Sequence, residues 1–138
     1  MKKFIVTTTI NSPTEATLKF CKIAQEKNWT FVIVGDTKTP HNEYKSLENS
    51  NVTYLTPDQQ ESLYPELSET IGWKSIQRRN IGFVFAYNQG ADIVATIDDD
   101  NIPYPNYFKE IYVNNIILYA INHDVIKIFD GIKVLLIL

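Results

Sequence analysis

The chain has 138 residues, 44% of them hydrophobic and 12% aromatic, which is enough to bury one sizeable core and excludes a disordered protein. Its net charge is −3, and its 13 Lys and Arg residues are scattered rather than clustered. Such a surface does not favour nucleic acid or an anionic membrane as a partner. We therefore expect a single globular domain over residues 1–138 with no nucleic-acid partner.

The chain begins with the pattern of a strand followed by that of a helix. Residues 2–10 are a short stretch rich in β-branched side chains, which predicts a strand. Residues 12–28 carry apolar side chains at helical spacing, which predicts a helix. The expected helix start has Ser12 as N-cap, Pro13 at the first helical position and Glu15 three residues after the cap.

Strand and helix patterns continue to alternate. Residues 29–36 and 51–56 predict the second and third strands, and a short helical or looped stretch is expected to follow the third. Residues 75–89 predict a helix, and residues 91–97 a fourth strand that is apolar on both faces, as in the centre of a parallel sheet. This alternation predicts an α/β fold, a Rossmann-like, mostly parallel sheet with helices on both faces.

The chain has no pattern typical of a membrane segment. The apolar stretch near the start covers only residues 4–6, and no small-residue cleavage site follows it. Residues 111–138 are rich in Ile, Leu and Tyr, but polar residues interrupt them, so no membrane span is expected. The single cysteine, Cys21, lies on the apolar helix face and favours a reducing compartment, so we expect a cytoplasmic protein.

Polar residues gather where the predicted strands end. The first strand ends in residues 7–9, all threonine, the second in Asp36, and the fourth in Asp98, Asp99 and Asp100. In open α/β sheets, ligands bind beyond the carboxyl ends of the strands. We therefore expect a binding site at this edge of the sheet.

Three consecutive aspartates indicate a cation. Adjacent carboxylates that are partly shielded from water raise one another's pKa, and a hard divalent ion such as Mg²⁺ or Mn²⁺ relieves this. On an extended backbone, Asp98 and Asp100 point to one side and Asp99 to the other, so the outer two are the expected ligands. The alternative is an ordinary solvated turn, because Pro103 follows closely.

Other polar residues fit a nucleotide site, each with an alternative. Arg78 and Arg79 are about 100° apart on a helix, so one can grip a diphosphate while the other faces water. Alternatively, both belong to a solvated basic face. Asp36 can accept hydrogen bonds from a nucleobase or ribose, or be a simple turn residue. His41 and His123 have no partner at metal-ligand spacing.

Residues 78–101, "RRNIGFVFAYNQGADIVATIDDDN", resemble the signature of GT-A-type nucleotide-sugar glycosyltransferases. With the preceding "SIQ", they are most similar to the reversibly glycosylated polypeptide and UDP-arabinopyranose mutase group and to STELLO-type proteins. The resemblance covers about residues 3–108 and implies the nucleotide-binding half of that fold, a UDP-sugar ligand, an acceptor of unknown identity, and Mn²⁺ or Mg²⁺. The roles it implies are Asp98 at the ribose and the metal, Asp100 at the metal, Asp99 at the sugar, Arg79 and Asn80 at the diphosphate, and Asp36 and Thr8 at the uracil.

The resemblance is incomplete after the aspartates. Only 38 residues follow Asp100, whereas domains of this family continue further and supply an acceptor site and a catalytic carboxylate. Glu110 is the one nearby candidate for a substitute base. We expect this chain by itself to bind nucleotide but to transfer sugar poorly, and to self-associate through the apolar run at residues 132–138.

The sequence leaves four candidate functions for this chain. A metal-dependent transferase of a UDP-sugar is the first, and a UDP-sugar mutase and a sugar-nucleotide-binding module without catalysis are its alternatives. A phosphatase of the haloacid dehalogenase type also uses an Asp-x-Asp pair, but the threonine expected after the pair is Ile102 here. An EF-hand is excluded, because Ile102 stands at its third ligand position.

Overall fold

The computed structural model describes residues 1–103, 126–129 and 132–136. Its strands are β1 (Lys3–Thr9), β2 (Thr30–Gly35), β3 (Val52–Leu55), β4 (Ile93–Thr96), β5 (Ile126–Phe129) and β6 (Ile132–Leu136). Its helices are α1 (Glu15–Lys27), α2 (His41–Lys45), α3 (Pro57–Leu63), α4 (Pro65–Ile71) and α5 (Arg79–Asn88), with a 3-10 turn, η1 (Ile76–Arg78), directly before α5.

The strands form one sheet in the order β3-β2-β1-β4-β6-β5. All neighbours are parallel except β5 and β6, so the predicted mostly parallel α/β fold is confirmed. From β1 the chain proceeds to β2 and β3 on one side and later returns to β4 on the other. The direction of the strand order therefore reverses between β1 and β4, which is where open α/β sheets bind ligands.

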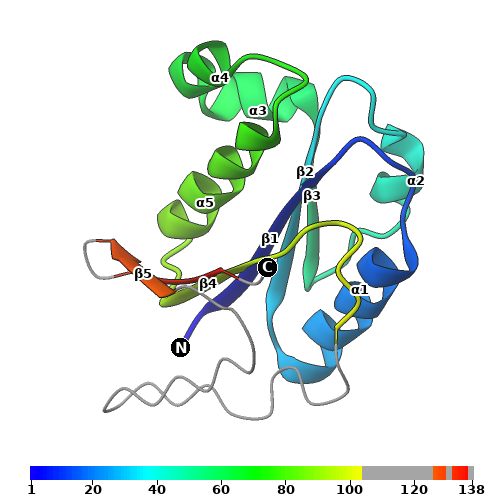
Figure 1. Cartoon of the computed structure of the whole chain (residues 1–138), viewed down its shortest axis with the longest axis vertical. Coiled ribbons are helices and arrows are strands. Elements are labelled where there is room, and N and C mark those ends of the chain that lie inside the picture. Colours follow the sequence, from blue (N-terminus) through cyan, green and yellow to red (C-terminus); the bar gives the residue numbers. More distant parts are fainter. Residues whose placement is uncertain (104–125, 130–131, 137–138) are drawn as a thin grey trace.

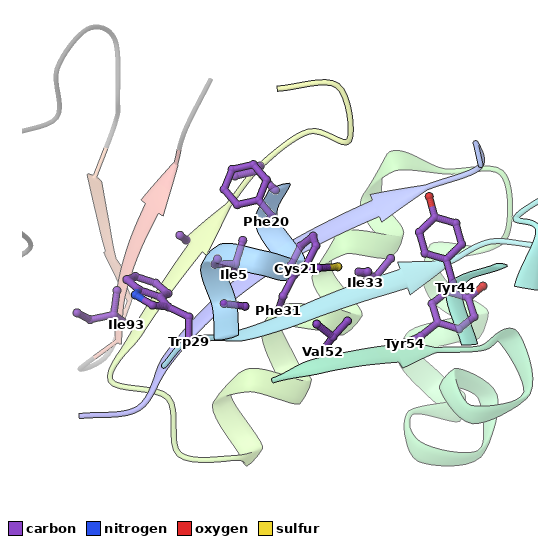
Figure 2. Packing of buried hydrophobic residues seen from close by; sticks show 13 residues of the cluster. Ile5, Phe20, Cys21, Trp29, Phe31, Ile33, Tyr44, Val52, Tyr54 and Ile93 are labelled. Atoms are coloured by element: carbon purple, nitrogen blue, oxygen red, sulfur yellow. The ribbon is translucent and has the colours of Figure 1, made fainter. Parts of the chain in front are cut away.

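Helices cover both faces of the sheet (Figure 1), and each face has its own apolar cluster. The α1-side cluster joins Phe20 of α1 to Phe31 of β2, whose ring centroids are 5.9 Å apart, and extends to the stacked rings of Tyr44 and Tyr54 (Figure 2). The α5-side cluster packs Ile81 and other α5 residues against β1, β2 and β4. Strand side chains alternate between the two clusters, as a sheet buried on both faces requires.

The first helix begins two residues later than predicted. Thr14, not Ser12, is the N-cap, because its hydroxyl accepts the backbone N–H of Thr17 at 3.1 Å. Ser12 lies outside the helix, where its hydroxyl contacts Glu43 at 3.4 Å on the surface. Pro13 therefore precedes the helix rather than opening it.

Thr14→Ala is expected to lower the free energy of unfolding by about 1 kcal/mol, the usual cost of losing a helix cap. Ser12→Ala is the matched control, with an expected change below about 0.5 kcal/mol because its contact is exposed. Urea unfolding of both variants makes the comparison. Equal effects of the two changes would contradict the assignment of the cap to Thr14.

The segment after β3 is more helical than the sequence indicated. α3 begins with a capping box, in which Thr56 and Gln59 satisfy each other's backbone N–H groups, and Pro57 occupies its first position. α4 follows directly and also begins with a proline, Pro65. The helix expected at residues 75–89 consists of η1 and α5 in succession.

The last described strands extend the sheet beyond β4. β6 runs parallel to β4, with Val94 opposite Val134. Residues 132–136 of the apolar run therefore enter the sheet as β6, but β5 pairs with the other side of β6. Among the described strands, the open edge on this side belongs to β5 rather than to that run.

None of the helices in the described part of the chain has the length and hydropathy needed to cross a membrane. Glu110 and His123 lie outside the described residues.

Candidate functional site

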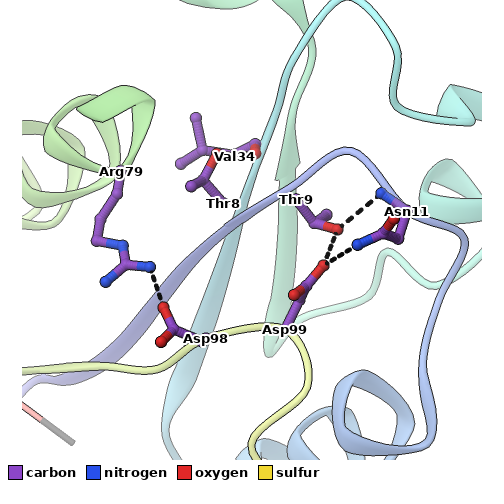
Figure 3. A network of polar contacts seen from close by, with 7 residues as sticks. All are labelled: Thr8, Thr9, Asn11, Val34, Arg79, Asp98 and Asp99. Carbon is purple, nitrogen blue, oxygen red and sulfur yellow. Dashed lines mark hydrogen bonds and ion pairs between the residues drawn. The ribbon is translucent and has the colours of Figure 1, made fainter. Parts of the chain in front are cut away.

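An arginine from the start of α5 and an aspartate that follows β4 meet at the carboxyl end of the sheet, where the strand order reverses (Figure 3). Arg79, the first residue of α5, donates through Nη2 to Oδ1 of Asp98, which follows β4. The Arg79 side chain is 19% exposed and that of Asp98 is 44% exposed. The pair is thus half-buried at the rim of the sheet, open to solvent on the aspartate side.

Asp99 points to the opposite face and fastens the loop between β1 and α1 (Figure 3). Its Oδ2 accepts hydrogen bonds from the Thr9 hydroxyl and from Asn11 Nδ2, the latter at 2.9 Å. Its backbone carbonyl accepts the hydroxyl of Thr14, the residue that caps α1. Asp99 therefore holds the end of β4 to the start of α1.

The aspartate triplet is not extended throughout. The N–H of Asn101 donates to the carbonyl of Asp98 at 3.2 Å, which closes a turn through Asp99 and Asp100. The expected alternation holds between Asp98 and Asp99, which contact groups on opposite faces. It does not extend to Asp100, because a turn replaces the extended backbone there. Asp100 is exposed.

Asp36 is buried at the end of β2, and its carboxylate holds a neighbouring loop. Oδ1 accepts from the backbone N–H and hydroxyl of Thr37, at 2.6 and 3.0 Å. Oδ2 accepts from the backbone N–H groups of Lys74 and Ser75, at 2.7 and 3.3 Å. Four donors thus meet one carboxylate, and Asp36 fixes the loop that leads into η1.

Thr8 and the two arginines lie on the α5 side of the sheet. Thr8 is 9% exposed and its hydroxyl donates to the carbonyl of Val34 at 2.9 Å. Arg78 is fully buried, so the expectation that one of the two arginines faces water is wrong. Its guanidinium lies 3.7 Å from the centre of the Trp73 ring. Asn80, the next residue of α5, is exposed.

Three buried polar atoms have no hydrogen-bond partner within the described part of the chain: Thr7 Oγ1, Thr96 Oγ1 and Arg79 Nε. Thr96 is the last residue of β4, and strand alternation with Val94 places it on the α5 side, where Asp98 contacts Arg79. Arg79 thus retains a donor that its ion pair with Asp98 does not use. A buried donor left unpaired is costly, so an acceptor that reaches it is strongly favoured.

The residues at the rim fit a hard divalent cation only in part. No group of three His, Cys, Asp or Glu side chains gathers at metal-binding distance in residues 1–103 or in the two described strands beyond. Mg²⁺ and Mn²⁺ usually take one or two protein carboxylates and complete their shell with water and phosphate oxygens. Asp98 and Asp100 supply two carboxylates, but Asp98 also pairs with Arg79 and the turn removes the shared orientation expected for the two. Oδ2 of Asp99 is already held by two donors.

A separate polar hollow of about 290 Å³ lies at the amino ends of the strands, away from this rim. It is lined by Met1, Lys2, Lys3, Phe4, Asn28, Thr30 and Gln89. The ammonium group of Lys2 donates to the carbonyl of Gln89 at 2.8 Å, and the Lys2 N–H to Asp92 at 2.6 Å. These two bonds connect the start of β1 to the segment before β4, so Lys2 is used in holding the fold together.

Several residues of the rim were not singled out by the sequence pattern. Asn11 and Thr14 contact Asp99 across more than 80 residues of chain, and Gln60 and Ser68 surround Arg78. The only available signal was the run of polar residues that follows β1.

No protein family matches the chain, and no curated protein is significantly similar to it.

Proposed function

We propose that this chain is a metal-dependent glycosyltransferase-like domain that binds a UDP-sugar at the carboxyl ends of β1, β2 and β4 and transfers the sugar to an acceptor. The observation that carries the proposal is the Arg79–Asp98 pair at the point where the strand order reverses. It places an anion-binding guanidinium beside a carboxylate at the position where open α/β sheets bind nucleotides.

In this proposal, each part of the rim has a separate task. Arg79 uses its unpaired Nε–H and its remaining donors to bind the diphosphate. Asp98 and Asp100 hold Mn²⁺ or Mg²⁺, whose charge neutralises the leaving diphosphate. Asp99 keeps the two flanking carboxylates in place through its contacts with Thr9 and Asn11.

The nucleobase is proposed to lie near Thr8 and Asp36. Because four donors already meet the Asp36 carboxylate, we propose that the base contacts the Lys74–Ser75 loop that this carboxylate holds. Asn80 extends the same rim toward the diphosphate.

A binding module without catalysis is the second candidate, and one observation favours it. An inverting transferase needs a base within hydrogen-bond reach of the acceptor. Among the described aspartates of the rim, the carboxylates of Asp36, Asp98 and Asp99 each accept hydrogen bonds from protein groups. Of these aspartates, only Asp100 is then left to act as the base. UDP binding without acceptor-dependent release of UDP from a UDP-sugar would select this candidate, and sugar isomerisation without an acceptor would select a mutase.

UDP is expected to bind at least about tenfold more tightly with Mn²⁺ than in chelator, and Asp100→Asn is expected to abolish that gain, because the amide has no charge to hold the metal. Isothermal titration of UDP with and without Mn²⁺ measures both effects. Asp92→Asn is the matched control, because Asp92 bonds the Lys2 N–H at the other end of the sheet. Equal UDP affinity in Mn²⁺ and in chelator would remove the metal from the proposal.

Two further parts of the proposal concern the cellular location of the protein and its self-association. Cys21 is buried, and burial raises the pKa of its thiol to about 11, so it is an unreactive core residue. A lone thiol of this kind is in keeping with the proposed cytoplasmic location.

The open edge offered by β5 is the proposed surface for self-association.

A further inference from the structure

Arg78 is a buried cation held by neutral acceptors. It is 0% exposed. Its Nε and Nη2 donate to Oε1 of Gln60 at 3.0 and 2.6 Å, and its Nη1 donates to the carbonyl and hydroxyl of Ser68 at 3.1 and 3.0 Å. Nη1 also contacts the carbonyl of Gly72 at 3.3 Å. Burial lowers the pKa of Arg78, and the charge of Asp36 acts in the opposite direction.

These contacts connect Arg78 to the sheet and to two helices. The side-chain amide of Gln60 donates to the carbonyls of Gly35 and Leu55, at 2.7 and 2.8 Å, which are the last residues of β2 and β3. Ser68 belongs to α4. The guanidinium of Arg78 therefore lies between the ends of β2 and β3, α3 and α4. The backbone of Arg78 lies at the junction of η1 and α5.

That junction lacks the usual means of fixing a helix start. No side chain caps α5 at Arg78, and η1 has 3-10 rather than α geometry. The backbone there is held by Ser75, whose hydroxyl accepts the Gln77 N–H, and by the bonds from Asp36 to the Lys74–Ser75 loop. The guanidinium fork of Arg78 therefore fixes the rotation of the helix start about its axis, together with the packing of Ile81 and Ala86 against the sheet.

The direction of Arg79 follows from that of Arg78. Adjacent helical residues lie about 100° apart, so holding Arg78 inward against Gln60 and Ser68 turns Arg79 toward β4. There Arg79 meets Asp98. A rotation of the helix start by a fraction of that angle would move the Arg79 guanidinium away from the carboxylate.

We propose that Arg78 is a positioning residue, which does not touch the ligand but sets the orientation of α5 so that Arg79 faces the binding rim. The identity of the ligand rests on the proposed function. The positioning of Arg79 against Asp98 does not, since it is a contact between two side chains of this protein.

The first test is a double-mutant cycle between Arg78→Met and Arg79→Gln, read out as UDP affinity in the presence of Mn²⁺. Arg78→Met is expected to weaken UDP binding about tenfold, and to weaken it less than about twofold when Arg79 is already Gln, because Arg78 acts through Arg79. A purely structural role gives the same loss in both backgrounds, and that result would overturn the proposal.

Loss of stability alone is controlled separately. Val52→Ala removes buried side-chain volume from the α1-side cluster and lowers stability without touching Arg78, so its UDP affinity is expected to stay unchanged. If Arg78→Met does not fold, Ser68→Ala takes its place, because it removes one acceptor and leaves the arginine. Its expected loss of affinity is about threefold, again confined to the background that retains Arg79. A tenfold loss from Val52→Ala would count against positioning.

The second test needs no ligand. The side-chain Nε–H signal of Arg79 in an ¹⁵N NMR spectrum, assigned by its absence in Arg79→Gln, is expected to shift in Arg78→Met (or in Ser68→Ala if that variant replaces it). An unmoved signal would overturn the positioning role whatever the protein binds. A shifted signal in a protein that does not bind UDP would uphold the positioning role and reject the proposed function instead.

Discussion

Gly82→Ala is expected to lower the free energy of unfolding by about 3 kcal/mol, even though alanine is the better helix former by about 1 kcal/mol. Gly82 lies in α5 where the helix meets β1 and β2. An added Cβ would overlap Cγ1 of Val6 and lie 2.9 Å from Cγ2 of Val34. Both valines are 0% exposed, so neither has free space to move into.

The source of this cost can be isolated by relieving the overlap. Val6→Ala removes the nearest methyl group, so Gly82→Ala is expected to cost at least about 1 kcal/mol less in a Val6→Ala background. Asn88→Ala is the control for helix propensity, because Asn88 is exposed on the same helix and its change is expected to stay within about 0.5 kcal/mol. Urea unfolding of the four proteins gives the coupling. A neutral Gly82→Ala would show that α5 can move away from the sheet.

Close packing at Gly82 has a consequence for the rim. Gly82 is three residues after Arg79, about one turn further along α5. The absence of a side chain at Gly82 lets the helix lie directly on β1, and this brings the Arg79 guanidinium within reach of Asp98 at the end of the neighbouring strand. Helix packing and the geometry of the candidate site therefore depend on the same glycine.

The strands were the most predictable part of the fold, for a physical reason. The runs that became β1, β2 and β4 are apolar and β-branched because both faces of the sheet are buried, and each boundary fell within two residues of the prediction. Since parallel strands end at the same edge, the polar residues after them were correctly expected to gather there. Asp98 and Asp99 do lie at that edge.

The sequence could not show which of two adjacent arginines is buried. A helix separates Arg78 and Arg79 by a fixed angle, but the direction of each depends on what surrounds it. The acceptors that draw Arg78 inward, Gln60 and Ser68, come from helices that the sequence indicated only as a short helical or looped stretch. Neutral acceptors leave no charge pattern that would reveal them.

The helix cap and the partners of Asp99 were missed for a related reason. Ser12 and Thr14 are both suitable caps, and the choice between them depends on the loop after β1. That loop is fastened to Asp99, 85 residues beyond Thr14. A contact across such a distance in the chain has no local signature, so the sequence alone favoured the cap with Pro13 after it.

Arg79→Gln is expected to change the affinities for metal and for nucleotide in opposite directions. Arg79 is the cation that contacts Asp98. Without it, Asp98 and Asp100 are less neutralised, so Mn²⁺ alone is expected to bind about tenfold more tightly, a change of roughly 1.4 kcal/mol. UDP with saturating Mn²⁺ is expected to bind at least about tenfold more weakly, because the diphosphate loses its charge-assisted hydrogen bonds.

Opposite changes are diagnostic because no general loss of structure produces them. A damaged rim would weaken both ligands, and a residue remote from the site would affect neither, so either result would contradict the placement of Arg79 between carboxylate and diphosphate. Arg79→Lys is the matched control. It retains the charge, so Mn²⁺ affinity is expected to stay within about twofold, while the loss of the planar fork still weakens UDP. Manganese titration by electron paramagnetic resonance and calorimetry with UDP measure the two affinities independently, so the metal site and the nucleotide site can each fail without the other.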